Sequence, residues 1–172
     1  MKKHIVSIVI LLFSITLFAQ ETEEQSKTLS KHAVGAAAGP TIGCGLAYQY
    51  TYSKFSVQLT FLPYKKPQEE LYCVGLSFYY TLNQGQKTSL FLYQGNHFYY
   101  HKKEGITVSW ENHRMALRMI DAFNNNSLGI GFGFKIFDNV SLKLMSGYAA
   151  YNNFTNLSLT GEIALLYHIP SK

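Results

Sequence analysis

Apolar residues recur at every second position along most of this chain, and that period limits what the chain can fold into. Side chains two residues apart lie on the same face of a β-strand, so a period of two predicts strands with one apolar face. Six segments show this alternation clearly, namely 46–52, 55–61, 72–82, 128–136, 140–145 and 157–167. Residues 32–38 and 88–101 show it more weakly, and they bring the predicted number of strands to eight.

The connections between the predicted strands alternate between short and long. Short turns at one end and longer loops at the other are typical of outer-membrane barrels. The predicted fold class is therefore all-β, an eight-stranded antiparallel up-and-down transmembrane β-barrel over residues 32–169. A bulge is expected at Gln94-Gly95-Asn96, and the first outward turn, near Gly39-Pro40, is expected to be very short. Turns are expected at 53–54, 83–87 and 138–139, and longer connections at 65–70, 102–126 and 152–156.

The polar face of the predicted strands favours a membrane barrel over a soluble one. A soluble barrel turns its polar face to water and needs many charged side chains there. Charged residues are only 15% of this chain, and the polar positions carry mostly Gly, Ala, Ser, Thr and Gln, which suit the crowded lumen of a small barrel. An interfacial girdle is expected from tyrosines near strand ends, namely Tyr50, Tyr52, Tyr79, Tyr80, Tyr99 and Tyr100. A soluble periplasmic, lipocalin-like ligand-binding barrel is an alternative.

The first 31 residues have the pattern of an export signal and a linker. Lys2 and Lys3 precede an apolar stretch over 5–18, which is too short to anchor a protein in a membrane. We expect residues 1–19 to be a signal peptide cleaved after Ala19, and residues 20–31 to be a flexible lead-in. Export across the inner membrane follows from this prediction. Together with the predicted membrane barrel, it indicates residence in the bacterial outer membrane.

Several segments resemble a known family of small bacterial outer-membrane β-barrel proteins. They are HAVGAAAG at 32–39, GLAYQY at 45–50, FSVQLTF at 55–61 and LGIGFGF at 128–134. The family comprises the OmpX/OmpA-type eight-stranded barrels and related barrel-domain proteins, and the resemblance covers most of residues 32–168. It implies insertion by the barrel-assembly machinery, for which Tyr167 in the last strand would serve as the aromatic signal, and outer-membrane lipid as the surrounding partner.

Three charged residues fall on the predicted inner face of the last three strands. They are Lys135, Lys143 and Glu162. Buried charges must pair, so we predict an interior ion cluster that fills the lumen. Cys44 and Cys73 fall on opposite faces of their strands and are therefore expected to be free thiols.

No catalytic, metal or cofactor motif stands out in the sequence, and no cofactor is expected. His97 and His101 share a face of one strand but lie roughly 13 Å apart, which is too far for one metal ion. A serine hydrolase would need a nearby Ser, His and acid. The candidates for such a set are His97, His101, His113, Ser109, Glu104 and Glu111, and an outer-membrane lipid A hydrolase or acyltransferase is the enzymatic alternative.

The region 102–126 lacks a clear strand pattern and is the expected contact surface. A short helix over Trp110–Phe123 and an extracellular β-hairpin extension are both compatible with its residues. Recognition tends to reside on loops over a rigid scaffold, so Trp110, His113 and Arg114 are candidate contact residues. The leading functional prediction is a non-enzymatic, monomeric outer-membrane barrel with a structural or surface-interaction role. Its net charge of +5 is too scattered to indicate nucleic acid binding.

Overall fold

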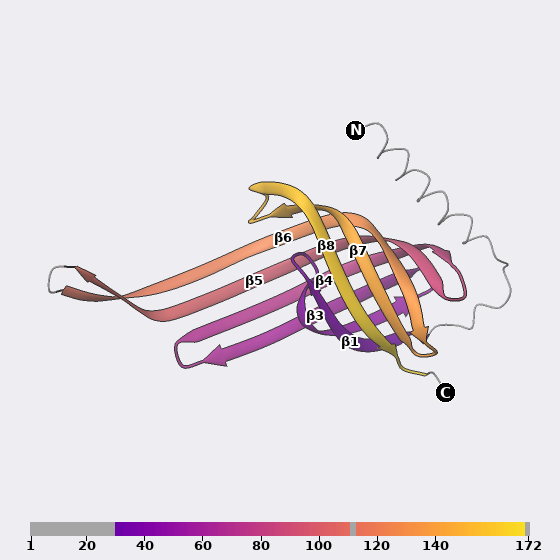
Figure 1. The fold of residues 1–172 in the computed structure, drawn as a ribbon, viewed down its shortest axis with the longest axis horizontal. Coiled ribbons are helices and arrows are strands. Elements are labelled where there is room, and N and C mark those ends of the chain that lie inside the picture. Colours follow the sequence, from indigo (N-terminus) through magenta and orange to yellow (C-terminus); the bar gives the residue numbers. More distant parts are fainter. Residues whose placement is uncertain (1–29, 111–112, 171–172) are drawn as a thin grey trace.

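Eight antiparallel strands close into one barrel (Figure 1), which confirms the predicted fold class of an up-and-down β-barrel. The computed structural model describes residues 30–110 and 113–170, with the side chains of 104–118 left out, so the predicted signal peptide and most of the lead-in lie outside it. The strands are β1 (His32–Gly39), β2 (Gly43–Tyr52), β3 (Phe55–Lys66), β4 (Glu69–Gln84), β5 (Thr88–Trp110), β6 (His113–Phe137), β7 (Val140–Tyr151) and β8 (Asn156–His168).

Each strand pairs with its sequence neighbour, and β1 closes the ring by pairing with β8. The two strands with the weakest sequence signal, β1 and β5, are both present. The expected bulge at 94–96 is wrong, because Gln94, Gly95 and Asn96 keep a continuous register with β4 and β6. The register of β5 shifts elsewhere, opposite Thr81 and Asn83 and again between Lys103 and Ile106.

The two faces of the sheet have the expected chemistry. Gln58, Thr60 and Ser77 point into the lumen and are fully buried. The outer face exposes a continuous set of large apolar side chains, which confirms the predicted face assignment and does not fit a lipocalin-like barrel with an apolar interior. The predicted girdle needs a correction, however. Tyr79 is buried in the lumen, and Tyr99 lies on the face that continues the lumen surface, because neighbouring residues of a strand face opposite ways.

Two hairpins extend far beyond one end of the barrel (Figure 1), while the turns at the other end are short. The longer hairpin consists of β5 and β6, with 23 and 25 residues. The helix expected over 110–123 is therefore wrong and the hairpin alternative is confirmed, since His113 to Phe123 form the first part of β6. The expected long connection at 65–70 is also wrong, because β3 and β4 continue to a turn at Pro67-Gln68.

The closed part of the barrel ends near one row of paired residues, which we call the rim row. Thr60, Gly75, His97 and Asn125 are direct cross-strand partners on β3 to β6. Above this row β3 soon loses its pairing with β2, after Phe61, and β6 has none with β7. The projecting sheet, as we call it, is formed by residues 61–66, 69–74, 98–110 and 113–124 of these four strands.

Candidate functional site

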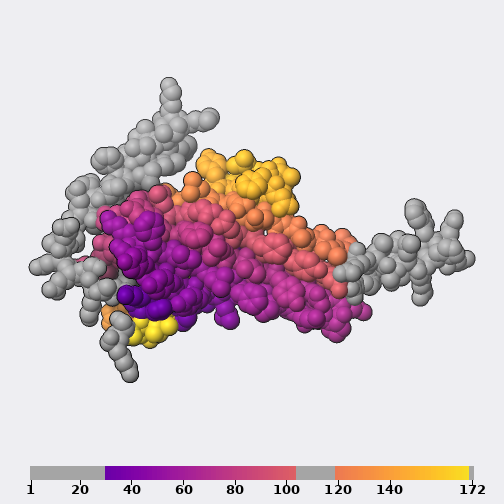
Figure 2. All heavy atoms as spheres, turned by 180° about the vertical axis from the view of Figure 1, so that it is seen from behind, coloured from indigo at the N-terminus to yellow at the C-terminus, as the bar shows by residue number. Residues whose placement is uncertain are grey.

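The projecting sheet is the most accessible structured surface outside the barrel wall. β5 continues from Phe98 to Trp110, which is roughly 40 Å of extended chain. Figure 2 shows the magenta β3–β4 hairpin and the adjoining part of β5 as one continuous projection from the barrel body. A surface that stands clear of the barrel can be reached by a partner without disturbing the packed lumen.

Aromatic pairs cover both faces of the projecting sheet near the rim row. On the face that continues the lumen surface, Tyr99 of β5 stacks on Phe123 of β6 with ring centroids 4.5 Å apart. On the face that continues the outer barrel wall, Tyr72 of β4 lies 6.1 Å from Tyr100 of β5. Tyrosine has an apolar ring and a polar hydroxyl, so the second pair suits the boundary between lipid and water.

Charged residues replace the aromatic ones at the turn between β3 and β4. Lys65 Nζ lies 2.9 Å from Glu70 Oε1, and His101 Nε2 lies 2.9 Å from Glu69 Oε1. The Glu70 carboxylate raises the pKa of the Lys65 ammonium, and contact with the Tyr64 side chain raises the pKa of Lys66. Both lysines therefore stay cationic at neutral pH, and the turn presents mixed charge to solvent.

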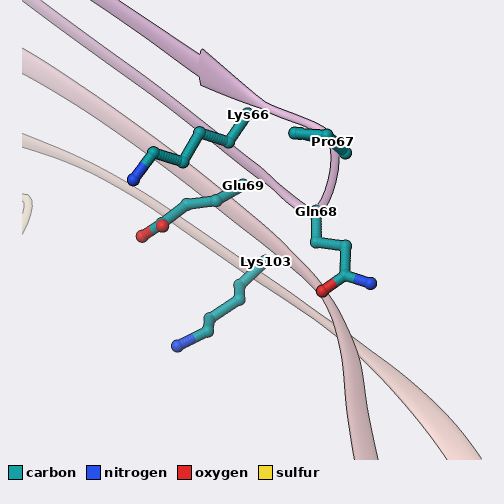
Figure 3. Close-up of a pocket in the computed structure, with 5 residues that line it drawn as sticks. All are labelled: Lys66, Pro67, Gln68, Glu69 and Lys103. Atoms are coloured by element: carbon teal, nitrogen blue, oxygen red, sulfur yellow. The ribbon is translucent and has the colours of Figure 1, made fainter.

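An open recess of about 420 Å³ lies beside this turn. Figure 3 shows Lys66, Glu69 and Lys103 extending to the same side of the sheet, with Pro67 and Gln68 at the turn. Lys66 comes from β3, Glu69 from β4 and Lys103 from β5, so three strands contribute to the recess. Its open shape and its charges indicate a surface for polar contacts and not a pocket that encloses a small molecule.

The two lateral edges of the projecting sheet differ. No described strand pairs with β3 beyond Phe61 on its β2 side, so Leu62 to Lys66 form an open edge. The base of the β6 edge is covered by the β7–β8 turn, where Asn153 N donates to Asn124 O and Asn124 N donates to Asn153 Oδ1, both at 3.0 Å. Within the described chain, β6 above Asn124 has no partner on its β7 side.

The predicted contact residues Trp110, His113 and Arg114 lie at the far end of this sheet. Trp110 pairs with His113, and Ser109 pairs with Arg114. The backbone thus brings all three to the end of the β5–β6 hairpin, while their side chains are among those left undescribed. Contact through these residues remains a prediction.

The three predicted interior charges have separate partners. Lys143 Nζ donates to Gln49 Oε1 at 2.5 Å, Glu162 accepts from Thr41 and Thr160, and Lys135 lies 4.0 Å from Asp138. Lys143 and Glu162 are buried, whereas Lys135 is partly exposed near the barrel end. The structure therefore does not join them in one cluster. Alternation placed all three on the inner face, but only the tertiary structure determines which polar group each side chain meets.

The remaining candidate groups are dispersed. His97 Nδ1 bonds the Pro40 carbonyl, whereas His101 bonds Glu69. Cys44 is exposed and Cys73 is buried, and both are free thiols, as expected. No group of three or more His, Cys, Asp or Glu side chains in the described part of the chain could hold a metal ion. The other residues proposed for a hydrolase, Glu104, Ser109, Glu111 and His113, fall where side chains are not described.

Sequence reasoning missed one feature of the lumen. The turn between β1 and β2 does not project outward but folds into the barrel, and Thr41 and Ile42 are fully buried there. Inner-face glycines on β4 and β5, Gly75 and Gly95, were the available signal, since they leave space beside the barrel wall.

The solved structures that are similar to this chain include two that each cover 80% of it. One is the N-terminal β-barrel domain of Pseudomonas aeruginosa OprF, at 11% identity and a TM-score of 0.48, covering 80% of this chain and 95% of that one. The other is Neisserial surface protein A (NspA), at 16% identity and a TM-score of 0.43, covering 80% and 93%. No family model and no curated protein sequence matches the chain. Among the described residues, no helix is long and apolar enough to cross a membrane.

Proposed function

We propose that this chain is a non-enzymatic barrel of the bacterial outer membrane that holds the projecting sheet outside the cell as a contact surface for another macromolecule. The observation that carries the proposal is the combination of an apolar outer wall with a four-stranded sheet extending beyond it. The wall supplies the anchor and the sheet supplies the accessible surface.

The outer wall has the height of a lipid bilayer. Every second residue of β8 from Leu157 to Tyr167 points outward, and all of these except Gly161 are large and apolar. This stretch rises roughly 33 Å, which a strand tilt of about 40° reduces to roughly 25 Å, the height of the apolar band of outer-membrane barrels. Aromatic residues mark both ends of the wall, with Tyr72 and Tyr100 at the base of the projecting sheet and Phe55 and Tyr80 near the short turns.

The described side chains of the projecting sheet suit contact with a protein or a glycan, and none of them belongs to a group that could hold a metal ion. Its edges offer unpaired main-chain groups that can bond an added strand, and its faces offer tyrosines with charged side chains around them. The lumen is filled by large side chains, with Tyr93 and Leu166 almost completely buried, which argues against passage or storage of solutes.

Fractionation tests the membrane anchor. Membranes from cells that express the full chain are washed with high salt and alkaline carbonate. We expect the protein to stay in the outer-membrane fraction and to change gel mobility on heating, as barrels do. Release into the wash would overturn the anchor and favour a soluble barrel.

Epitope tags test the placement of the projecting sheet. One tag is inserted after Glu111, in the β5–β6 connection, and a matched control tag after Asp138, in a short turn at the opposite barrel end. We expect antibody to label the first tag on intact cells and the second only after the outer membrane is permeabilised. The reverse pattern would place the sheet in the periplasm and refute surface contact.

A further inference from the structure

The turn at Pro40-Thr41-Ile42, which we call the lumen turn, lies inside the barrel. It contacts the inner face of strands β4, β5 and β6. In Figure 1 the indigo turn between β1 and β2 lies within the outline of the barrel and does not extend past the barrel mouth. Strand β2 contacts β4 and β5, although neither is its neighbour in the sheet. The turn therefore joins strands that the sheet itself keeps apart.

The contacts of the lumen turn concentrate on the rim row. The Pro40 carbonyl accepts two hydrogen bonds, from His97 Nδ1 at 3.0 Å and from Asn125 Nδ2 at 2.9 Å. His97 and Asn125 are direct partners across β5 and β6. The Ile42 carbonyl lies against the backbone of Gly75, which is the partner of His97 on β4. One short turn thus contacts three adjacent strands at a single level.

A second set of contacts lies one row deeper in the lumen. Thr41 Oγ1 lies 2.6 Å from Ser127 Oγ of β6 and bonds the Glu162 carboxylate of β8. Glu162 also accepts from Thr160 Oγ1 at 3.2 Å. The turn is therefore fixed to the opposite side of the barrel as well, which gives it a rigid base.

Glycine is required where the turn meets the wall. A Cβ atom at Gly75 would overlap the Ile42 carbonyl, and one at Gly95 would lie 2.8 Å from the Thr41 carbonyl oxygen. Gly43, with φ of +81°, lets the chain turn back into β2 in a conformation that side chains disfavour. Three glycines in separate strands thus serve one contact.

From this geometry we infer that the lumen turn is an internal brace for the projecting sheet. The rim row is the level at which the barrel opens: β3 pairs with β2 only as far as Phe61, and β6 is held on its β7 side only by the β7–β8 turn, at Asn124 and Asn125. A sheet that loses its lateral partners can bend at that level. The two bonds to the Pro40 carbonyl hold β5 and β6 there, so the brace limits the bending. This inference does not depend on what the projecting sheet contacts.

Hydrogen exchange on the full chain in detergent micelles tests the brace. The double variant H97A/N125A removes both donors to Pro40, together with the acceptor of the Asn152 amide in the β7–β8 turn. We expect amide exchange in residues 98–124 to accelerate about tenfold or more, with little change in β7 and β8 outside the turn at Asn152, because local opening governs exchange. The matched control is S141A/H168A, which removes another buried histidine bond, at 2.7 Å, from the opposite end of the lumen. It should leave residues 98–124 unchanged.

Unchanged exchange in residues 98–124 of H97A/N125A, or equal acceleration in both double variants, would overturn the brace. If the double variant does not insert, N125A alone keeps the His97 bond and is expected to give a smaller acceleration in the same residues. Gly75→Ala displaces the turn without removing a donor and is expected to act like H97A/N125A. Gly161→Ala, at a glycine with nothing within 4 Å of the added atom, is its control.

Discussion

Lys143 is an unusual residue because its charge is buried among neutral groups. Its Nζ lies 3.9 Å from the centroid of Tyr79 and 5.1 Å from that of Phe91, and it donates to Gln49. Ring faces attract a cation, which offsets part of the cost of removing an ammonium from water. In the described part of the chain no carboxylate forms an ion pair with it, so the side chain is held by weaker interactions than a salt bridge.

The effect of a Lys143 substitution on the free energy of unfolding should therefore depend on the charge of the new side chain. Lys143→Met keeps the length of the side chain and its packing on Tyr79 and Phe91, and we expect unfolding free energy to stay the same or rise by about 1–2 kcal/mol. Lys143→Glu turns a carboxylate toward ring faces and the Gln49 oxygen, and should cost about 3 kcal/mol or more. The urea dependence of heat-modifiable gel mobility measures both.

Lys54→Met, in an exposed turn, is the control for a change of net charge and should leave the unfolding midpoint unchanged. A strong loss of stability in Lys143→Met would contradict this account, since it would show that the ammonium itself holds the lumen together. Equal losses in Lys143→Met and Lys143→Glu would contradict it as well.

Residue faces were predictable from the sequence, but residue partners were not. Alternation correctly placed Lys143 and Glu162 in the lumen, because the period of a strand is local. It did not reveal that Thr41 would reach the Glu162 carboxylate, because that contact joins residues 121 positions apart through an inserted turn. Adjacent tyrosines show the same limit: Tyr79 and Tyr80 both look like girdle residues by composition, yet only Tyr80 lies on the outer wall.

At the level of elements, the parts of the strands that form the closed barrel were predicted well, whereas their extensions beyond the barrel were not. β6 alternates cleanly from Leu128 to Ile136, where its inner face is buried, but not from His113 to Phe123. A strand outside a closed barrel has little constraint on which of its positions are apolar, and both a helix and a hairpin fit these residues. Pairing with β5 decides the matter, and such pairing is a tertiary property.

Deleting residues 105–122 should remove most of the projecting part of the β5–β6 hairpin and leave a folded barrel. Tyr99 and Phe123 pair directly, so residues 100–104 can close the shortened hairpin as a surface loop. We expect the deleted chain to insert into membranes and to keep its heat-dependent gel shift. Failure to insert would show that the hairpin is needed for assembly, and the idea that it is a separable contact surface would be refuted.

At the level of the whole molecule, the outer wall reverses the usual arrangement of a soluble protein. The large side chains that this wall exposes are apolar, whereas polar side chains such as Gln58, Thr60 and Ser77 are buried in the lumen behind it. In water such a surface would aggregate, whereas in a bilayer it is the favourable arrangement. The cost of placing a charge on this wall should therefore depend on its depth in the membrane.

Two arginine substitutions on the wall measure that dependence. Leu144 lies on the middle of β7, paired with Phe132 and Ile163, whereas Leu157 lies at the start of β8 near the barrel mouth. In lipid vesicles Leu144→Arg should lower unfolding free energy by about 2–4 kcal/mol and Leu157→Arg by about 0–1 kcal/mol. Urea titration of both variants beside the parent chain gives the values. If the two side chains face water instead, both substitutions should leave the free energy of unfolding almost unchanged. Equal, small effects would therefore contradict the placement of this wall in a bilayer.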